Sequence, residues 1–325
     1  MTRSRLAPGA GIVTVPGAAP VLRTSGGDFL RIDTGGVTGE ALVRRLAGEE
    51  APGGEPSGEE SQAAELARLV EAFEAGGHAV SAPPRAPLAG RTVHVLGDPL
   101  LAGPVARCAG AEGAEVQPIT PNKVAELVRT TPDHRTEGRL AVVWCLDSPV
   151  PEGLWDVADR LPDRRIAWLR CHREGSHAWT EPLAAAAGDV TSRHVRLRRL
   201  AATPAHRELA AYWAGHRTPD TGPHPTAASA ALIAALLTAD LIAWAEAEAE
   251  AEAEAEAEAE GVGVGVSGAG RQSAGLPARR RLRRIDLRDL TFTEHPVLPV
   301  PDVAPLPAPA PAGTRSRSDT AGARP

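Results

Sequence analysis

The sequence predicts an α/β fold in two parts: an N-terminal α+β unit of winged-helix type, and a larger Rossmann-like domain built on a parallel sheet. Two observations predict this fold class. Residues 1–84 combine short strand patterns, joined by a tight turn, with two amphipathic helix patterns. After residue 85, apolar strand patterns alternate with helix patterns, as in a parallel sheet that is covered on both faces.

The first unit opens with strand patterns in "GIVTV" and "VLRTSGGDFLRID". The second pattern is interrupted by Ser25, Gly26 and Gly27, which together favour a hairpin turn. Two strands are therefore expected on either side of that turn.

Two helices are expected after the hairpin. Thr38 is a good N-cap residue for "GEALVRRLAG". A longer helix, spanning 63–75 and opened by Ser61, has its large apolar residues on one face; these are Leu66, Leu69, Val70 and Phe73. The intervening "EEAPGGEPSGEE" predicts an acidic loop.

The second part should run from residue 85 to 244. The expected elements are strand 92–96, helix 104–112, a short strand near Val116, helix 123–129, strand 139–147, helix 154–160 and strand 164–172. The apolar stretch 227–244 is the length of a membrane span, but its large residues form one stripe. We expect a buried helix there, and no membrane insertion.

Beyond Trp244 the chain changes in character. Residues 245–277 form an Ala-Glu and Gly-Val tract that predicts a linker, 278–301 should return as a closing strand of the α/β domain, and the Pro/Ala-rich tail 302–325 predicts disorder. The Ala-Glu tract has no large apolar residue, so its deletion should leave the fold nearly unchanged.

Composition excludes several classes of protein. The net charge of −6 comes with eight glutamates in 246–260, and the remainder is close to neutral, which gives no case for nucleic-acid binding. Cys108, Cys145 and Cys171 are sparse and odd in number, as in reduced cytosolic proteins. The N-terminus lacks the apolar region of a signal peptide, so a cytoplasmic location is expected.

No cofactor, metal or catalytic site is predicted. A phosphate-binding turn needs several glycines, whereas the turn after strand 92–96 contains Gly97, the anionic Asp98 and Pro99, which has no N–H. The histidines and cysteines around His172 and His177 lack the paired spacing of a zinc site.

The order of parts resembles the ThiF-like leader-peptide-binding proteins of azole-forming bacteriocin clusters. The matching pieces are "VLRTSGGDFLRID" and "AELARLVEAFEAGG" for the N-terminal element, "VHVLGDPLLAGPVARCAGAEGAEV" and "AVVWCLDSPVP" for the α/β domain, and "IDLRDLTFTEHPVLPVPD" for its end. The resemblance covers about 5–301. The two Cys-x-x-Cys zinc pairs that are common in that family are absent here.

The resemblance implies a non-catalytic scaffold in the maturation of a ribosomal peptide (RiPP). Its N-terminal unit would be a RiPP recognition element that binds a precursor's leader peptide, and its partner would be a YcaO-type cyclodehydratase. Whether the chain forms a homodimer stays open. The expected peptide-binding residues, on the strand after the turn and on the second helix, are Asp28, Phe29, Leu30, Arg31, Ile32, Leu66, Leu69, Val70 and Phe73.

Two alternatives follow from the same scaffold. The first is an ATP-dependent ThiF-like adenylating enzyme, which requires the glycine-rich turn that is missing here. The second is a winged-helix DNA-binding regulator, whose recognition helix should be basic. The second helix instead has Arg68 against Glu65, Glu71 and Glu74.

Overall fold

The chain divides into two compact units, Met1–Ala86 and Pro87–Pro325, close to the predicted boundary after residue 84. The structure is a computed structural model of all 325 residues. It describes residues 4–15, 18–47, 59–81, 86–130, 138–219, 221–259 and 275–301. Most of the predicted acidic loop, the whole Gly-Val tract 261–270 and the tail after residue 301 lie outside the described residues.

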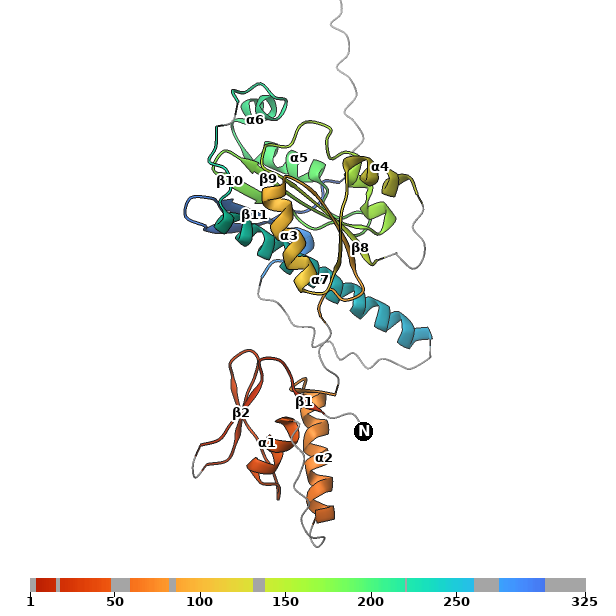
Figure 1. The fold of residues 1–325 in the computed structure, drawn as a ribbon, viewed down its shortest axis with the longest axis vertical. Helices are drawn as coiled ribbons and strands as arrows, with labels where there is room; N and C mark the ends of the chain where they lie inside the picture. The colour runs from red at the N-terminus through yellow and green to blue at the C-terminus, as the bar shows by residue number, and fades with distance from the viewer. Residues whose placement is uncertain are drawn as a thin grey trace, which may run out of the picture. The chain divides into compact units, whose positions relative to one another are not determined.

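The N-terminal unit has the predicted winged-helix-like α+β composition (Figure 1). Its elements are β1 (Arg5–Leu6), β2 (Gly11–Val13), β3 (Val21–Arg23), β4 (Phe29–Arg31), α1 (Gly39–Ala47), α2 (Glu59–Ala75) and β5 (Ala79–Val80). Strands β2, β3 and β4 form an antiparallel sheet in that order, and β1 pairs with β5. The β1–β5 ribbon was not predicted, because two-residue strands show no alternation.

The predicted turn and helix cap are both present. The β3–β4 turn is closed by the Thr24 N–H, which donates to the Asp28 carbonyl at 2.8 Å, and Gly27 has the positive φ of 93° that this turn requires. At the start of α1, the Ala41 N–H donates to the Thr38 hydroxyl at 3.2 Å. The hairpin therefore fixes the register of β4 against β3.

The α/β unit is built on one seven-stranded sheet, in agreement with the predicted Rossmann-like class. Its strands are β6 (Thr92–Gly97), β7 (Glu115–Pro118), β8 (Leu140–Leu146), β9 (Ala167–Glu174), β10 (His177–Thr180), β11 (Arg281–Asp286) and β12 (Phe292–Pro296). The spatial order is β12-β11-β10-β9-β8-β6-β7. The four strands β7, β6, β8 and β9 are parallel, and β10 to β12 continue the sheet in antiparallel fashion.

Helices cover both faces of this sheet. They are α3 (Pro99–Ala111), α4 (Pro121–Arg129), α5 (Ser192–Ala202), α6 (His206–Trp213) and α7 (Ala227–Ala259), with short 3-10 turns η1 (Ala158–Arg160), η2 (Pro162–Arg164) and η3 (Ala278–Arg280). Helices α3 and α7 pack on one apolar cluster, while α4 and η1 pack on a second cluster on the other side of β8. Figure 1 shows α3 and α7 side by side against the sheet.

Several predicted boundaries were wrong. Helix α3 begins at Pro99 and not at 104, because a proline in the first turn loses no helical hydrogen bond. Pro104 lies inside this helix. The expected helix 154–160 is only a 3-10 turn, which Pro162 and the left-handed Arg165 (φ 53°) interrupt. The closing strand 278–301 is in fact the β11–β12 hairpin.

The apolar stretch 227–244 is the buried helix that the sequence predicts. By length and composition, α7 could cross a membrane, but Ile233, Leu237 and Leu241 are completely buried in the core of the α/β unit. Asp240, also on this helix, is 2% exposed and accepts hydrogen bonds from Arg281 at 2.6 Å and from Arg283 at 2.6 and 3.0 Å. This ion pair joins α7 to strand β11.

The boundary predicted after Trp244 requires correction, since α7 continues through the Ala-Glu tract to Ala259. Ala245 is buried, and its carbonyl accepts from the Arg91 guanidinium at 3.1 Å. Glu248 pairs with Arg279 at 3.2 Å, and Glu252 lies 3.4 Å from Arg139. Alternating Ala and Glu residues place glutamates on every side of a helix, so some of them face the sheet and bind its arginines.

Asp240→Ala should destabilise the α/β unit by about 3–5 kcal/mol, because Arg283 would remain buried without its main partner. The melting temperature and the urea midpoint should both fall. Glu250→Ala, at an exposed position of the same helix, is the matched control and should change neither. Equal stability of the two variants would contradict a structural role for this ion pair.

Deletion of 253–260 should leave the melting temperature nearly unchanged, because the described glutamates of that segment form no ion pair within the described residues. Deletion of 245–260 removes Ala245, Glu248 and Glu252 as well, and should lower it clearly. Thermal melting of both variants beside the full chain tests this difference. Identical curves for the two deletions would restore the original prediction that the whole tract is dispensable.

Candidate functional site

Strand β4 forms an edge of the three-stranded sheet, because among the described residues it pairs only with β3. An edge strand presents unpaired backbone N–H and C=O groups that another chain can pair with. The predicted peptide-binding segment around Phe29–Arg31 therefore has a backbone available for strand addition.

The register shows which backbone groups face outward. Thr24 pairs with Asp28, and the Ile32 N–H donates to the Pro20 carbonyl at 3.3 Å. In an antiparallel pair the bonding direction alternates, so Asp28, Leu30 and Ile32 bond to β3. The N–H and C=O groups of Phe29 and Arg31 consequently point to the free edge.

The side chains of β4 are exposed where a ligand strand would lie. Phe29 is 63% exposed and Leu30 is 46% exposed, and Asp28 and Arg31 are exposed as well. Large apolar side chains are usually buried, so two adjacent exposed ones on an edge strand are notable. Ile32, in contrast, is 8% exposed and belongs to the core of the unit.

The predicted residues of α2 fall into two pairs. Val70 and Phe73 are buried in the same small core as Ile32, so their side chains serve packing. Leu66 and Leu69 are half-buried and keep part of their surface exposed. Among the predicted α2 residues, only these two leave surface for a ligand.

Helix α2 also lies against the chain that leaves β4. A Cβ atom built on Gly35 would lie 2.0 Å from the Glu65 carboxylate, so the Glu65 side chain lies directly against Gly35, whose φ is 54°. Glu65 precedes Leu66 on α2, and Gly35 follows shortly after β4. The Glu65 side chain therefore contacts the segment that follows β4.

In the α/β unit, the packing of two strands requires a glycine at position 97. A Cβ at this position would lie 1.8 Å from the Cys145 carbonyl, and φ is 112°. The glycine permits the close approach of β6 to β8 where the two strands end, and does not itself indicate a phosphate-binding turn.

Ligands of parallel sheets bind beyond the carboxyl ends of the strands, where the strand order reverses. Here that point lies between β6 and β8, and an internal charged network occupies it. The Asp98 carboxylate accepts from the Asp147 N–H at 2.6 Å. Asp147 in turn binds the buried Arg173 and the exposed His224, the latter at 2.7 Å. An anionic phosphate at this place would meet two carboxylates.

This network was missed in the sequence analysis, apart from Asp98. Asp147 directly follows a buried strand, so its place at the carboxyl edge could have been predicted. Arg173 and His224 come from distant segments, and no local pattern connects them to Asp147.

The buried cysteines are poor nucleophiles. Burial, with a contribution from Asp98, raises the pKa of the Cys145 thiol to about 12, and burial raises the pKa of Cys171 well above its usual value. A thiol reacts as its thiolate, so both remain unreactive near neutral pH.

The histidines that could have suggested a metal site belong to ion-pair networks. His172 lies 3.2 Å from Glu174, and His177 lies 3.6 Å from Asp286. Within the described ranges, no group of three or more His, Cys, Asp or Glu side chains is arranged to hold a metal ion.

The fold defines a class of protein: a winged-helix-like unit followed by a Rossmann-like unit whose carboxyl edge is filled by its own side chains. No protein-family model and no curated protein matches the sequence.

Among solved structures, the chain is similar to a heterocyclase in complex with substrate and cofactor, with a TM-score of 0.60 and 10% identity. It is also similar to the heterocyclase TruD, with a TM-score of 0.58 and 12% identity. The two alignments cover 91% and 92% of this chain, but only 38% and 42% of those chains. The chain thus shares the fold of part of each heterocyclase.

Gly97→Ala should destabilise the protein by about 3 kcal/mol or more, through the clash with Cys145 and the positive φ. Gly110→Ala on α3 is the control, since its Cβ would find Val116 at an ordinary 3.8 Å. The free energy of unfolding of both variants, measured in urea, tests this prediction. An unchanged urea midpoint for Gly97→Ala would show that the close approach of β6 to β8 does not require a glycine at this position.

Proposed function

We propose that this chain is a non-catalytic, cytoplasmic scaffold that binds the leader peptide of a ribosomal precursor. It would present the precursor to a YcaO-type cyclodehydratase that forms azolines and azoles. The fold that the chain shares with part of two heterocyclases supports this assignment. So does the order of its parts, which resembles the ThiF-like partner proteins.

The observation that carries the proposal is the free edge of β4. A leader strand placed beside it would bond to the outward-facing N–H and C=O groups of Phe29 and Arg31. These bonds fix register and direction without regard to the leader's side chains. They require only that the leader be extended.

Specificity would come from the side chains around that edge. Leu30 lies on the face of the sheet that packs on the core, opposite Leu22, and is still 46% exposed. Leu30 would offer apolar surface for a leader side chain, and the half-buried Leu66 and Leu69 of α2, which pack on the same core as Leu22, would offer more. The exposed Arg31 would favour an acidic leader, with a contribution of about 1 kcal/mol or less.

The adenylating alternative has less support. It needs backbone N–H groups that are free to bind phosphate at the start of α3, whereas the Asp98 and Asp147 carboxylates occupy this edge of the sheet. The absence of a catalytic role is part of the proposal, and a nucleotide titration would test it separately.

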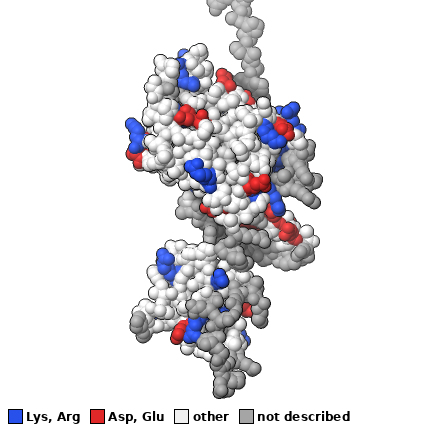
Figure 2. Space-filling model, in the orientation of Figure 1, with Lys and Arg blue, Asp and Glu red and all other residues white. Residues whose placement is uncertain are grey.

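The DNA-binding alternative has little electrostatic support. Helix α2 carries Arg68 against Glu65, Glu71 and Glu74, so phosphates would be repelled. On the face of the α/β unit seen in Figure 2, Lys and Arg side chains lie scattered among acidic and uncharged residues, with no large basic surface.

Arg31→Pro should weaken leader binding about ten-fold or more, because proline removes one outward N–H from the edge and crowds the incoming strand. The fold should survive, since proline is tolerated on an edge whose N–H faces solvent. The measurement is fluorescence polarisation of the full chain with a labelled leader peptide of a ribosomal precursor.

Arg31→Ala is the matched control, because it removes the side chain and keeps the N–H; it should weaken binding only a few-fold. Leu30→Glu should weaken binding strongly by placing a charge on the apolar surface. Residues 1–86 alone should bind about as tightly as the full chain. Equal affinities for Arg31→Pro and Arg31→Ala would rule out strand addition at β4.

A further inference from the structure

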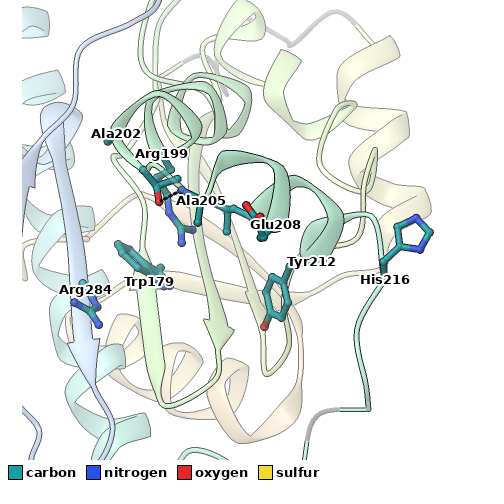
Figure 3. A pocket seen from close by; sticks show the side chains of 10 residues that line it. Trp179, Arg199, Ala202, Ala205, Glu208, Tyr212, His216 and Arg284 are labelled. Atoms are coloured by element: carbon teal, nitrogen blue, oxygen red, sulfur yellow. Dashed lines mark hydrogen bonds between the residues drawn. The ribbon is translucent and has the colours of Figure 1, made fainter.

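A second site lies in the α/β unit, between strands β10 and β11 and helices α5 and α6. Figure 3 shows this hollow, which has a volume of about 900 Å³. Trp179 and Arg284 approach it from the strands, and Tyr212 and Glu208 approach it from α6. The leader-binding proposal does not use it.

The walls combine aromatic and apolar side chains with charged ones, and one charged side chain is held in place. Arg199 lies 4.1 Å from the centre of the Trp179 ring and 5.1 Å from the centre of the Trp213 ring. Its guanidinium also makes two bonds to Glu174, at 3.0 and 2.5 Å. Burial would raise the pKa of the Glu174 carboxyl, but the bonds from His172 and Arg199 hold it well below its usual range. The positive charge of Arg199 is therefore neutralised, and the cluster acts as a fixed aromatic wall.

The polar groups of the hollow are mostly donors. Trp179 has only a donating N–H, and Arg284 has five N–H groups, one of which is directed to His177 at 2.9 Å. Glu208 is the main acceptor among the lining side chains. A ligand rich in carbonyl groups and poor in N–H groups fits such a site, and a proline-rich peptide has this chemistry.

An anionic ligand such as a nucleotide fits less well. The Arg199 charge is already compensated by Glu174, one face of Trp179 is covered by that guanidinium, and Glu208 adds a negative charge to the wall. Aromatic rings beside small residues are instead typical of sites that recognise proline-rich segments, and here Ala202 and Ala205 are the small residues.

The chain itself carries such a sequence immediately after the closing hairpin. Residues 302–312 read "DVAPLPAPAPA". The described chain leading to them is attached to α5, where Arg198 donates to the Leu298 carbonyl at 3.2 Å and to the Pro299 carbonyl at 2.9 Å. Helix α5 also contributes Arg199 and Ala202 to the hollow. At about 3 Å per residue, an extended segment of this length can reach from one side of a helix to the other.

We propose that the hollow lined by Trp179, Arg284 and Tyr212 is a binding site for a proline-rich peptide, and that the chain's own residues 302–312 are its ligand. A partner with a similar sequence would have to displace that segment.

The test uses a fluorescein-labelled peptide of sequence DVAPLPAPAPA. It should bind a chain ending at residue 301 at least ten-fold more tightly than it binds the full chain, in which the site is already taken. A full-length variant with the prolines of 302–312 changed to alanine should bind the peptide as the truncated chain does. This variant controls for an effect of truncation on folding. No binding to either form would overturn the proposal.

Side-chain variants in the chain ending at residue 301 locate the site. Trp179→Ala and Arg284→Ala should each weaken peptide binding, the first by ten-fold or more. Arg107→Ala, exposed on α3, is the matched control and should have no effect. Equal binding of a peptide with its prolines changed to alanine, or competition by an oligothymidylate, would show that the site does not recognise proline.

Discussion

The buried ion pair between Asp240 and Arg283 fixes strand β11 against helix α7 in the α/β unit. Both side chains are 2% exposed, and they join the central helix α7 to strand β11, which lies far along the chain. Two charges inside a protein are tolerated only when they satisfy each other. The ion pair ties the closing hairpin to α7, which packs on the sheet through its apolar residues. The same hairpin then leads the chain to α5, where Arg198 donates to the Pro299 carbonyl.

The two larger sheets of the protein differ in which edge is open to a ligand. In the larger sheet, the place where a Rossmann-like fold binds ligands is filled by Asp98, Asp147, Arg173 and His224. In the smaller sheet, β4 keeps an open edge with exposed apolar side chains. A closed carboxyl edge in one unit and an open strand edge in the other suit a protein that holds a peptide better than one that activates a nucleotide. We infer the scaffold role from this contrast.

Local patterns predicted much of the fold. The apolar strands β6, β8 and β9, the Ser25-Gly26-Gly27 turn and the Thr38 cap could be identified, since each depends on neighbouring residues. Long-range relations could not: the open edge of β4, the burial of Val70 and Phe73, and the Arg173 network depend on tertiary packing. Helices α5 and α6 were missed because arginine-rich and short segments lack a strong apolar stripe.

Backbone hydrogen exchange, measured by NMR on the labelled full chain with and without the leader peptide, tests the central claim most directly. The account predicts that the amides of Phe29 and Arg31, which point to the free edge, become protected by ten-fold or more. The amide of Leu30, which already faces β3, should change little. Unchanged exchange at Phe29 and Arg31, with new protection at residues 97–102, would contradict it and place the ligand on the α/β unit.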